Sequence, residues 1–277
     1  FVILLVISSL NGDGQGKQMR QDDASKSAYS HDGFLGEKLR LRQPTDGFRS
    51  GHDAVLLAAM ANPPQGGHVA ELGSGAGVAS LCFAARRSDA HVIGIEFDGE
   101  MVALAQANAA ANNFGARAQF RQGDVAGAFG DLRLVANSFD EVIANPPFHE
   151  AGTVSEMTHE GKARAHIGKE GTLDSWVKCA CALTRAGGHI SFIHRADALD
   201  RLLTVMPKRL GDLHVLPIMP KPKTAATRVL VRGKRDAGAP VTLLPPLILQ
   251  DENGESSAAA EAVLRHGAAL AFGRNRG

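Results

Sequence analysis

The feature that most constrains the fold is a regular alternation of strand-like and helix-like segments between residues 68 and 195. Apolar runs such as HVAEL (68–72) and HVIGIEF (91–97) are each followed by a helical pattern, and the order repeats as far as HISFIHR (189–195). Such alternation is typical of a parallel sheet with helices on both faces. We therefore predict an α/β fold with a mostly parallel, seven-stranded sheet and antiparallel strands at its edge, from residues 212–220 and 227–233. One of its helices, TLDSWVKCACALTRAGG (172–188), is expected to end at its two glycines.

The rest of the chain indicates one main domain with extensions, because 277 residues that are 44% hydrophobic suffice for one sizeable core. We expect residues 1–32 to be a poorly ordered extension and residues 33–66 to form a strand and helix subdomain. The core is expected at 67–235, with a C-terminal extension at 236–277. The N-terminal FVILLVISSL is too short for a membrane span and weak as a signal peptide, and the missing initiator Met leaves open a fragment.

Charge and cysteine content say little about function by themselves. Three cysteines, Cys82, Cys179 and Cys181, are too few for a disulfide framework, which favours a reducing cytoplasm. The formal charge is +1, but residues 195–235 hold ten Lys or Arg and three Asp. This excess indicates either a face for an anionic partner or scattered solubilising charge.

A glycine-rich turn, ELGSGAG, follows the first strand of the predicted sheet. Glycines there let a ligand approach the backbone. A dinucleotide fingerprint would need a third glycine at Val78 or Ser80, so a nicotinamide oxidoreductase is disfavoured. The pattern instead resembles the first motif of class I S-adenosylmethionine-dependent methyltransferases, which have a Rossmann-like fold. That resemblance implies S-adenosylmethionine as the cofactor, with its methionine part wrapped by Gly73, Gly75 and Gly77, and with Glu71 close to it.

Two further acidic residues end the next two predicted strands. Glu96 follows the second strand, where a carboxylate can accept hydrogen bonds from both ribose hydroxyls. Asp124, after the third strand, is positioned to accept from the adenine amino group. Each of these acids alone is equally explained as a surface residue near a helix start. Three acids at three successive strand ends favour the cofactor site.

The segment NPPF (145–148) follows the fourth predicted strand. It matches the (N/D)-P-P-(F/Y/W) motif of methyltransferases that modify planar amino or amide nitrogens. The lone pair of such a nitrogen is delocalised, so it is a poor nucleophile. The Asn145 side-chain oxygen and the Pro146 carbonyl would accept its two N–H bonds and orient it for in-line attack. Phe148 would stack on the target ring. This chemistry requires neither a strong base nor a metal, and the alternative for NPPF alone is a rigid turn with a core Phe.

The resemblance extends to a narrower family through GFLGEKLRLRQPTDGFRSGHDAVLLAA (33–59) upstream, and GKARAHI, HRADALDRL and TRVLVRG downstream. These segments are similar to the bacterial small-domain methyltransferases that N6-methylate an adenine beside the anticodon of a valine tRNA. The resemblance implies the target-base role for Asn145, Pro146 and Phe148. It implies cofactor binding by Gly73, Gly75, Glu96, Asp124 and Asn145, with Asp53 near the cofactor.

Several alternatives remain open from the residues. NPPFH is common in relatives that methylate guanine N2 in ribosomal RNA, and NPPY-type relatives methylate a glutamine amide of release factors. A cofactor-binding partner subunit without catalysis is a further possibility. An RNA substrate agrees with the basic region 195–235. We expect a cytoplasmic monomer that binds RNA and neither a membrane nor a metal, with Trp176 and Cys179 in the core.

Overall fold

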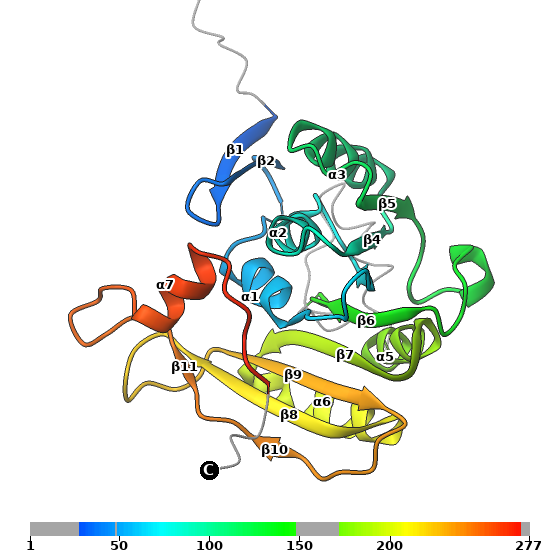
Figure 1. The fold of residues 1–277 in the computed structure, drawn as a ribbon. Coiled ribbons are helices and arrows are strands. Elements are labelled where there is room, and N and C mark those ends of the chain that lie inside the picture. Colours follow the sequence, from blue (N-terminus) through cyan, green and yellow to red (C-terminus); the bar gives the residue numbers. More distant parts are fainter. Residues whose placement is uncertain (1–27, 48, 148–171, 273–277) are drawn as a thin grey trace, which may run out of the picture.

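The computed structural model describes residues 28–47, 49–147 and 172–272, and a twisted central sheet runs through it (Figure 1). The sheet order is β5, β4, β3, β6, β7, β9 and β8, and the two-residue strands β10 and β11 pair with β8. The strands of this sheet are β3 (His68–Leu72), β4 (His91–Glu96), β5 (Ala118–Gln122), β6 (Phe139–Ala144), β7 (Thr184–Arg195), β8 (Leu210–Met219), β9 (Arg228–Arg235), β10 (Thr242–Leu243) and β11 (Leu247–Ile248).

The predicted α/β fold with seven principal strands is confirmed. Among the described strands of this sheet, only β9 runs antiparallel to its neighbours, and it lies between β7 and β8. The antiparallel strand is therefore one position inside the edge. Because β3, β4, β5, β6 and β7 are parallel, their carboxyl ends all lie along one edge of the sheet.

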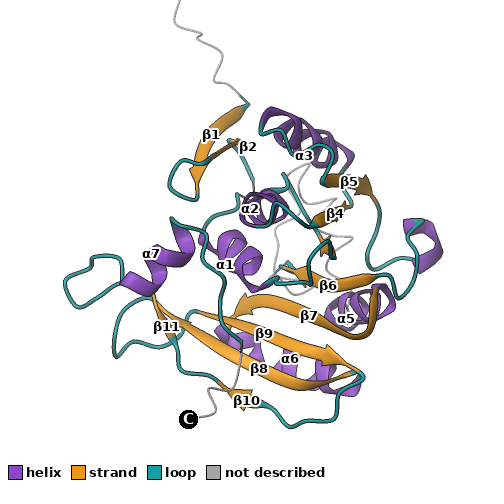
Figure 2. Ribbon diagram, in the orientation of Figure 1, coloured by secondary structure: helices purple, strands orange, loops and turns teal. Residues whose placement is uncertain are grey.

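Helices cover both faces of the sheet (Figure 2). The helices α1, α2 and α3 contribute to one buried cluster that includes Leu57 and Phe83, whereas α5 and α6 contribute to the other, which includes Trp176 and Leu202. Trp176 and Cys179 are each 7% exposed, so their predicted place in the core is confirmed. The helices are α1 (His52–Met60), α2 (Val78–Arg86), α3 (Gly99–Ala111), α5 (Thr172–Leu183), α6 (Leu199–Val205) and α7 (Ala258–Leu264), with short 3-10 turns η1 (Phe129–Leu132), η2 (Ala196–Ala198) and η3 (Met206–Lys208).

A separate two-stranded hairpin, β1 (Tyr29–Phe34) and β2 (Leu39–Pro44), precedes α1. The buried residues Leu39 and Leu41 of β2 face α2 and α3. The hairpin begins inside the segment expected to be disordered, and residues 1–27 lie outside the described residues. At the other end of the chain, the segment after α7 returns to α1, where Leu270 N donates to Ala59 O at 2.9 Å.

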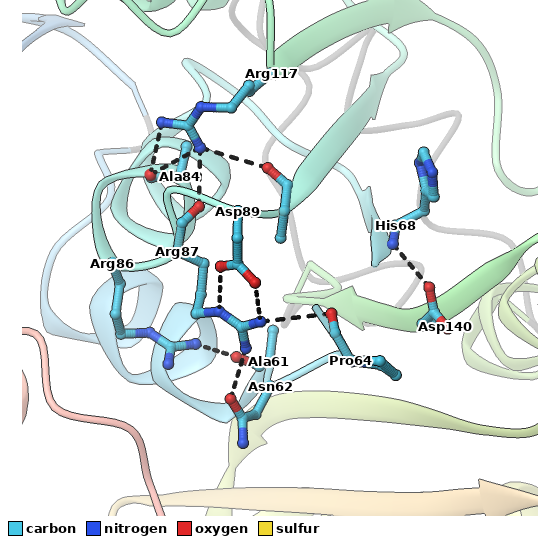
Figure 3. A network of polar contacts seen from close by, with 11 residues as sticks. Ala61, Asn62, Pro64, His68, Ala84, Arg86, Arg87, Asp89, Arg117 and Asp140 are labelled. Atoms are coloured by element: carbon cyan, nitrogen blue, oxygen red, sulfur yellow. Dashed lines mark hydrogen bonds and ion pairs between the residues drawn. The ribbon is translucent and has the colours of Figure 1, made fainter. Parts of the chain in front are cut away.

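The amino edge of the sheet is fastened by arginines (Figure 3). Arg117 donates to the carbonyl of Ala84 in the last turn of α2 and to those of Arg87 and Ala90 just beyond it. Arg87 bonds Asp89 and Asn62, and Arg86 donates to carbonyls at the end of α1. These cations meet the negative ends of two helices, where they are electrostatically favoured.

The boundary between α5 and β7 differs from the sequence expectation. The glycines at 187 and 188 were predicted to stop the helix, yet α5 ends at Leu183 and β7 already begins at Thr184. The register between β6 and β7 shifts after Thr184, and Gly187 has φ +71°. The glycine pair therefore serves a bulge within the strand, where a left-handed residue is needed.

No helix in the described ranges is long and apolar enough to cross a membrane.

Candidate functional site

The register of the sheet brings most of the predicted site residues together. Leu72 of β3 lies opposite Ala144 of β6 and Ile95 of β4, and Glu96 of β4 lies opposite Gln122 of β5. The residues that follow these positions therefore stand side by side at the carboxyl edge. They are Asn145 after β6, the turn 73–77 after β3, Glu96 at the end of β4 and Asp124 beyond β5. In open α/β sheets this is the edge where ligands bind.

The glycine turn has one open position. Gly73, Gly75 and Gly77 all have positive φ, at +68°, +51° and +83°. A Cβ on Gly73 would lie 2.5 Å from the Trp176 ring, and one on Gly77 would lie 2.7 Å from the Phe120 ring. A Cβ on Gly75 would meet no atom within 4 Å among the described residues. The outer two glycines are therefore required by packing, whereas the backbone at Gly75 is open to a ligand.

Glu96 holds the turn against the neighbouring strand. One carboxylate oxygen accepts from Gly75 N at 2.8 Å, and the other accepts from Asp98 N at 3.0 Å. Each carboxylate oxygen can accept a second hydrogen bond, so hydroxyl donors of a ligand can still be accommodated. The arrangement fixes both the carboxylate and the backbone N–H beside it.

Glu71 differs from the other acids because its side chain is buried, with 3% exposure. Its carboxyl group accepts from both Ser80 N and Ser80 Oγ at the start of α2. Burial, opposed by the two bonds from Ser80, raises the pKa of Glu71 to about 8. Among the described residues, the hydrogen bonds of the Glu71 carboxyl group come from α2 and not from the open side of the turn.

Asp124 closes a tight turn after β5, where its Oδ1 accepts from Ala126 N at 2.8 Å. The residue is half-buried. Beside it lies a groove of about 250 Å³ between the loop after Asp124 and α5. The groove is lined by Val125, Ala126, Gly127, Phe129, Leu132, Ser175, Lys178, Cys179 and Ala182. A flat apolar group of a ligand next to Asp124 would find partly apolar walls here.

Asn145 has an unsatisfied acceptor. Its Oδ1 is buried yet has no hydrogen-bond partner within the described part of the chain. Pro146 is buried beside it. An unpaired buried polar atom costs roughly 1–3 kcal/mol, so it needs a reason. A ligand N–H would satisfy this oxygen. Phe148, the third member of the predicted target-base group, lies outside the described residues.

Asp53 lies in the first turn of α1, at the same edge of the sheet. Its Oδ2 accepts from Arg228 Nε at 2.7 Å, with the two side chains 24% and 31% exposed. Arg228 begins β9 and is in register with Arg195, the last residue of β7. The ion pair therefore joins the N-terminal block to the far side of the site. The structure gives Asp53 this protein partner, and its proximity to a cofactor stays a prediction.

Sequence reasoning missed three residues. Ser80 holds Glu71, and the exposed Phe97 follows Glu96 with 43% of its surface accessible. Asn108, only 1% exposed, accepts from Arg42 N and donates to the carbonyls of Arg42 and Ala76. Asn108 thus ties β2 to the glycine turn. An aromatic directly after a strand-ending acid was a usable signal for Phe97, whereas Asn108 sits in an Ala-rich helix without one.

Comparisons with known proteins indicate the class of enzyme. Residues 50–177, which contain the turn, Glu96, Asp124 and Asn145, match the family model of the methyltransferase small domain. Over these residues the chain is similar to the methyltransferase small domain. The predicted methyltransferase identity and S-adenosylmethionine cofactor are thereby confirmed, together with the fold.

Individual relatives and a solved structure that are similar to this chain are methyltransferases by name. A tRNA1(Val) (adenine(37)-N6)-methyltransferase of Porphyromonas gingivalis is 29% identical over 196 residues, covering 66% of this chain and 75% of the relative. One from Vibrio vulnificus is 25% identical over 200 residues, covering 72% and 80%. The crystal structure of a predicted O-methyltransferase from Agrobacterium tumefaciens is similar to this chain with 26% sequence identity and a TM-score of 0.68. The match covers 79% of this chain and 98% of that one.

Proposed function

We propose that this methyltransferase transfers the methyl group of S-adenosylmethionine to the N6 amino group of an adenine in tRNA. The observation that carries the proposal is Asn145 Oδ1 at the carboxyl end of β6, which is buried and has no hydrogen-bond partner among the described residues. The relatives named as tRNA adenine-N6 methyltransferases support the choice of adenine and of tRNA.

The target nitrogen is oriented by two oxygen acceptors. In the proposed complex, the amino group donates one N–H to Asn145 Oδ1 and the other to the Pro146 carbonyl. Accepting both bonds draws the nitrogen toward the pyramidal geometry of the transition state and aims its lone pair at the methyl carbon. The nitrogen becomes acidic once it is methylated, so its proton leaves to water without a strong base. Phe148 stacks on the adenine ring.

The cofactor would supply a methyl group on a positively charged sulfur: as the N–C bond forms, the S–C bond breaks and its electron pair stays on sulfur, which leaves neutral S-adenosylhomocysteine. We place its methionine part along Gly73, Gly75 and Gly77, where the open backbone at Gly75 allows close approach. The Glu96 carboxylate would accept hydrogen bonds from the ribose hydroxyls. Asp124 would accept a hydrogen bond from the adenine amino group beside the partly apolar groove. Glu71 acts behind the turn through Ser80, and Asp53 lies near the cofactor as the partner of Arg228.

The acceptor is tested by transfer of a labelled methyl group from S-adenosylmethionine to three substrates in parallel. These are unmodified bulk tRNA, ribosomal RNA and release factor, each followed by analysis of the labelled nucleoside or residue. N6-methyladenosine in tRNA is the expected product. N2-methylguanosine in ribosomal RNA, or a methylated glutamine amide, would move the target while keeping the mechanism. Cofactor binding with no labelled acceptor would indicate a partner subunit without catalysis.

The cellular location and the oligomeric state of the protein are part of the same proposal. We infer a cytoplasmic monomer, in which the three cysteines are free thiols as they are in the structure. Light scattering of the protein with and without tRNA measures the number of copies in the complex. One copy per tRNA is expected.

A further inference from the structure

The outer face of the β1–β2 hairpin collects cationic and aromatic side chains. Cross-strand pairing places His31 opposite Arg42, and Tyr29 opposite Pro44. These residues and Arg40 share the face opposite to the buried Leu39 and Leu41. The Arg42 guanidinium lies 4.5 Å from the centre of the Tyr29 ring. The exposed Lys38 extends this face at the turn of the hairpin. We call the set Tyr29, His31, Lys38, Arg40 and Arg42 the hairpin face.

The charge of the hairpin face is available to a partner. In the described part of the chain, the Arg42 guanidinium contacts an aromatic ring rather than a carboxylate. Arg40 pairs with Glu37 at 3.3 Å, but both side chains are largely exposed, at 75% and 66%. Exposed pairs of this kind contribute little and exchange readily for a phosphate.

The basic segment 195–235 is a poorer candidate, although the sequence pointed to it. Six of its ten cations are in ion pairs with carboxylates in the structure. Arg232 is 9% exposed and bonds Glu141 at 2.8 Å inside the protein. In four of these pairs the arginine is at most 31% exposed, whereas the Arg195–Asp197 and Lys223–Glu252 pairs are largely open to solvent. Four of the ten cations are therefore held in at least partly buried pairs.

The hairpin face is also held next to the candidate site. Asn108 Nδ2 donates to the carbonyl of Arg42 at 2.9 Å and to that of Ala76, within the glycine turn, at 3.0 Å. Gln43 of β2 also donates to Ser50 O and accepts from Ser50 N, just before α1 and Asp53. A nucleic acid on this face would thus lie beside the residues that bind the cofactor and the target base.

We propose that the hairpin face binds the RNA strand next to the target adenine. Arg40, Arg42 and Lys38 contact phosphates, while Tyr29 and His31 stack on an unpaired base. A single-stranded loop fits best, because two bases must leave the stack: the target adenine to reach Asn145, and a neighbouring base to reach an aromatic ring of the hairpin. This inference rests on the proposed RNA methyltransferase function.

The test is equilibrium binding of an unmodified tRNA transcript by fluorescence anisotropy over a range of salt concentrations. The variant Arg40→Ala/Arg42→Ala is compared with Arg133→Ala/Arg185→Ala, a control that removes the same charge elsewhere on the surface. We expect the hairpin variant alone to weaken binding at least about fivefold and to reduce the salt slope by about 1 to 2. The Kd for S-adenosylmethionine should stay within about twofold, which also shows that the variant is folded.

A second variant separates stacking from charge. Tyr29→Leu should weaken binding of the same transcript roughly tenfold without changing the salt slope, because stacking involves no counterion release. Equal affinity and slope in hairpin and control variants would overturn the inference. A wild type without affinity for tRNA, or hairpin variants that impair only release-factor methylation, would overturn it as well.

The outcomes distinguish this inference from the proposed function. A wild type that binds tRNA through the hairpin but transfers no methyl to it would contradict the function and support the hairpin face. A wild type that forms N6-methyladenosine while the hairpin variants bind normally would support the function and contradict the hairpin face.

Discussion

The two edges of the central sheet treat their polar groups in opposite ways. At the amino edge, arginines satisfy helix-terminal carbonyls, as Arg117 does for Ala84 and Arg87 (Figure 3). At the carboxyl edge, the turn 73–77 contains three glycines with positive φ, and Asn145 Oδ1 is buried without a partner in the described part of the chain. The amino edge has one exception, because Arg86 Nε is also buried without a hydrogen-bond partner among the described residues.

The difference indicates where stability has been given up for ligand binding. Arg86 retains two hydrogen bonds through Nη2, so its guanidinium is anchored despite the unpaired Nε. Asn145 Oδ1, in contrast, is an acceptor next to an open backbone, which a ligand N–H can complete. Cavity size alone would mislead: a cavity of about 430 Å³ lies on the amino side, lined by Asn62, His189, Arg232 and residues 269–272. Its Arg232 is already paired with Glu141.

The largest effect is expected at Asn145. Asn145→Ala removes the acceptor that orients the target nitrogen, so kcat should fall about 100- to 1,000-fold. The Kd for S-adenosylmethionine should change less than about threefold. Single-turnover methyl transfer and calorimetric cofactor binding measure the two quantities. Asn145→Asp keeps an acceptor oxygen and should lose less activity. Parallel loss of transfer and cofactor binding in the alanine variant would contradict the assigned role.

The next effect is expected at Asp124. Asp124→Ala should raise the Kd for S-adenosylmethionine roughly ten- to hundredfold, because a hydrogen bond to a charged acceptor contributes about 1.5–3 kcal/mol. The rate at saturating cofactor should be much less affected. Asp124→Asn, which keeps an oxygen acceptor for Ala126 N, is the matched control and should lie between. A normal Kd in the alanine variant would remove Asp124 from the cofactor site.

Glu71 gives a smaller effect with a defined pH dependence. Its folded-state pKa of about 8 lies above the ordinary 4.5, so the folded protein holds a proton that the unfolded chain releases between these values. The contribution of Glu71 to stability is thus full below about pH 4.5 and falls as pH rises toward 8. From pH 5.5 to 7.5, urea unfolding should show wild type losing about 1–2 kcal/mol relative to Glu71→Gln. The same pH dependence of the free energy of unfolding in wild type and Glu71→Gln would contradict the raised pKa of Glu71.

The smallest effect is expected at the amino edge. Arg87→Met removes the bonds to Asp89 and Asn62 on a partly exposed side chain, so the free energy of unfolding should fall by about 1 kcal/mol. The kcat and cofactor Kd should equal those of wild type. Urea unfolding and methyl transfer on the same preparation measure both. A folded variant with a severalfold lower kcat would break the contrast between the edges.

Much of the fold could be predicted because local patterns determine it. The strands at 68–72 and 91–96 are continuous apolar runs, and the order of motifs at successive strand ends follows from a parallel sheet. The glycines at 187 and 188 were misread because a helix stop and a bulge use the same left-handed geometry. Local sequence does not distinguish the two.

Long-range partners could not be predicted. Asp53 pairs with Arg228 across 175 positions, and Arg232 pairs with Glu141 across 91. The basic segment therefore looked available for RNA, whereas four of its ten cations are held in at least partly buried ion pairs. Asn108 likewise gains its role only when β2 and the glycine turn meet in space.

Hydrogen exchange with and without S-adenosylmethionine tests the central contrast most directly. Slower amide exchange is expected at residues 73–77, 96–98 and 123–127, which form the carboxyl edge. No change is expected at residues 61–64 and 84–89 of the amino edge. Protection confined to the amino edge, or to the segment 269–272 over the larger cavity, would contradict the assignment of the cofactor site.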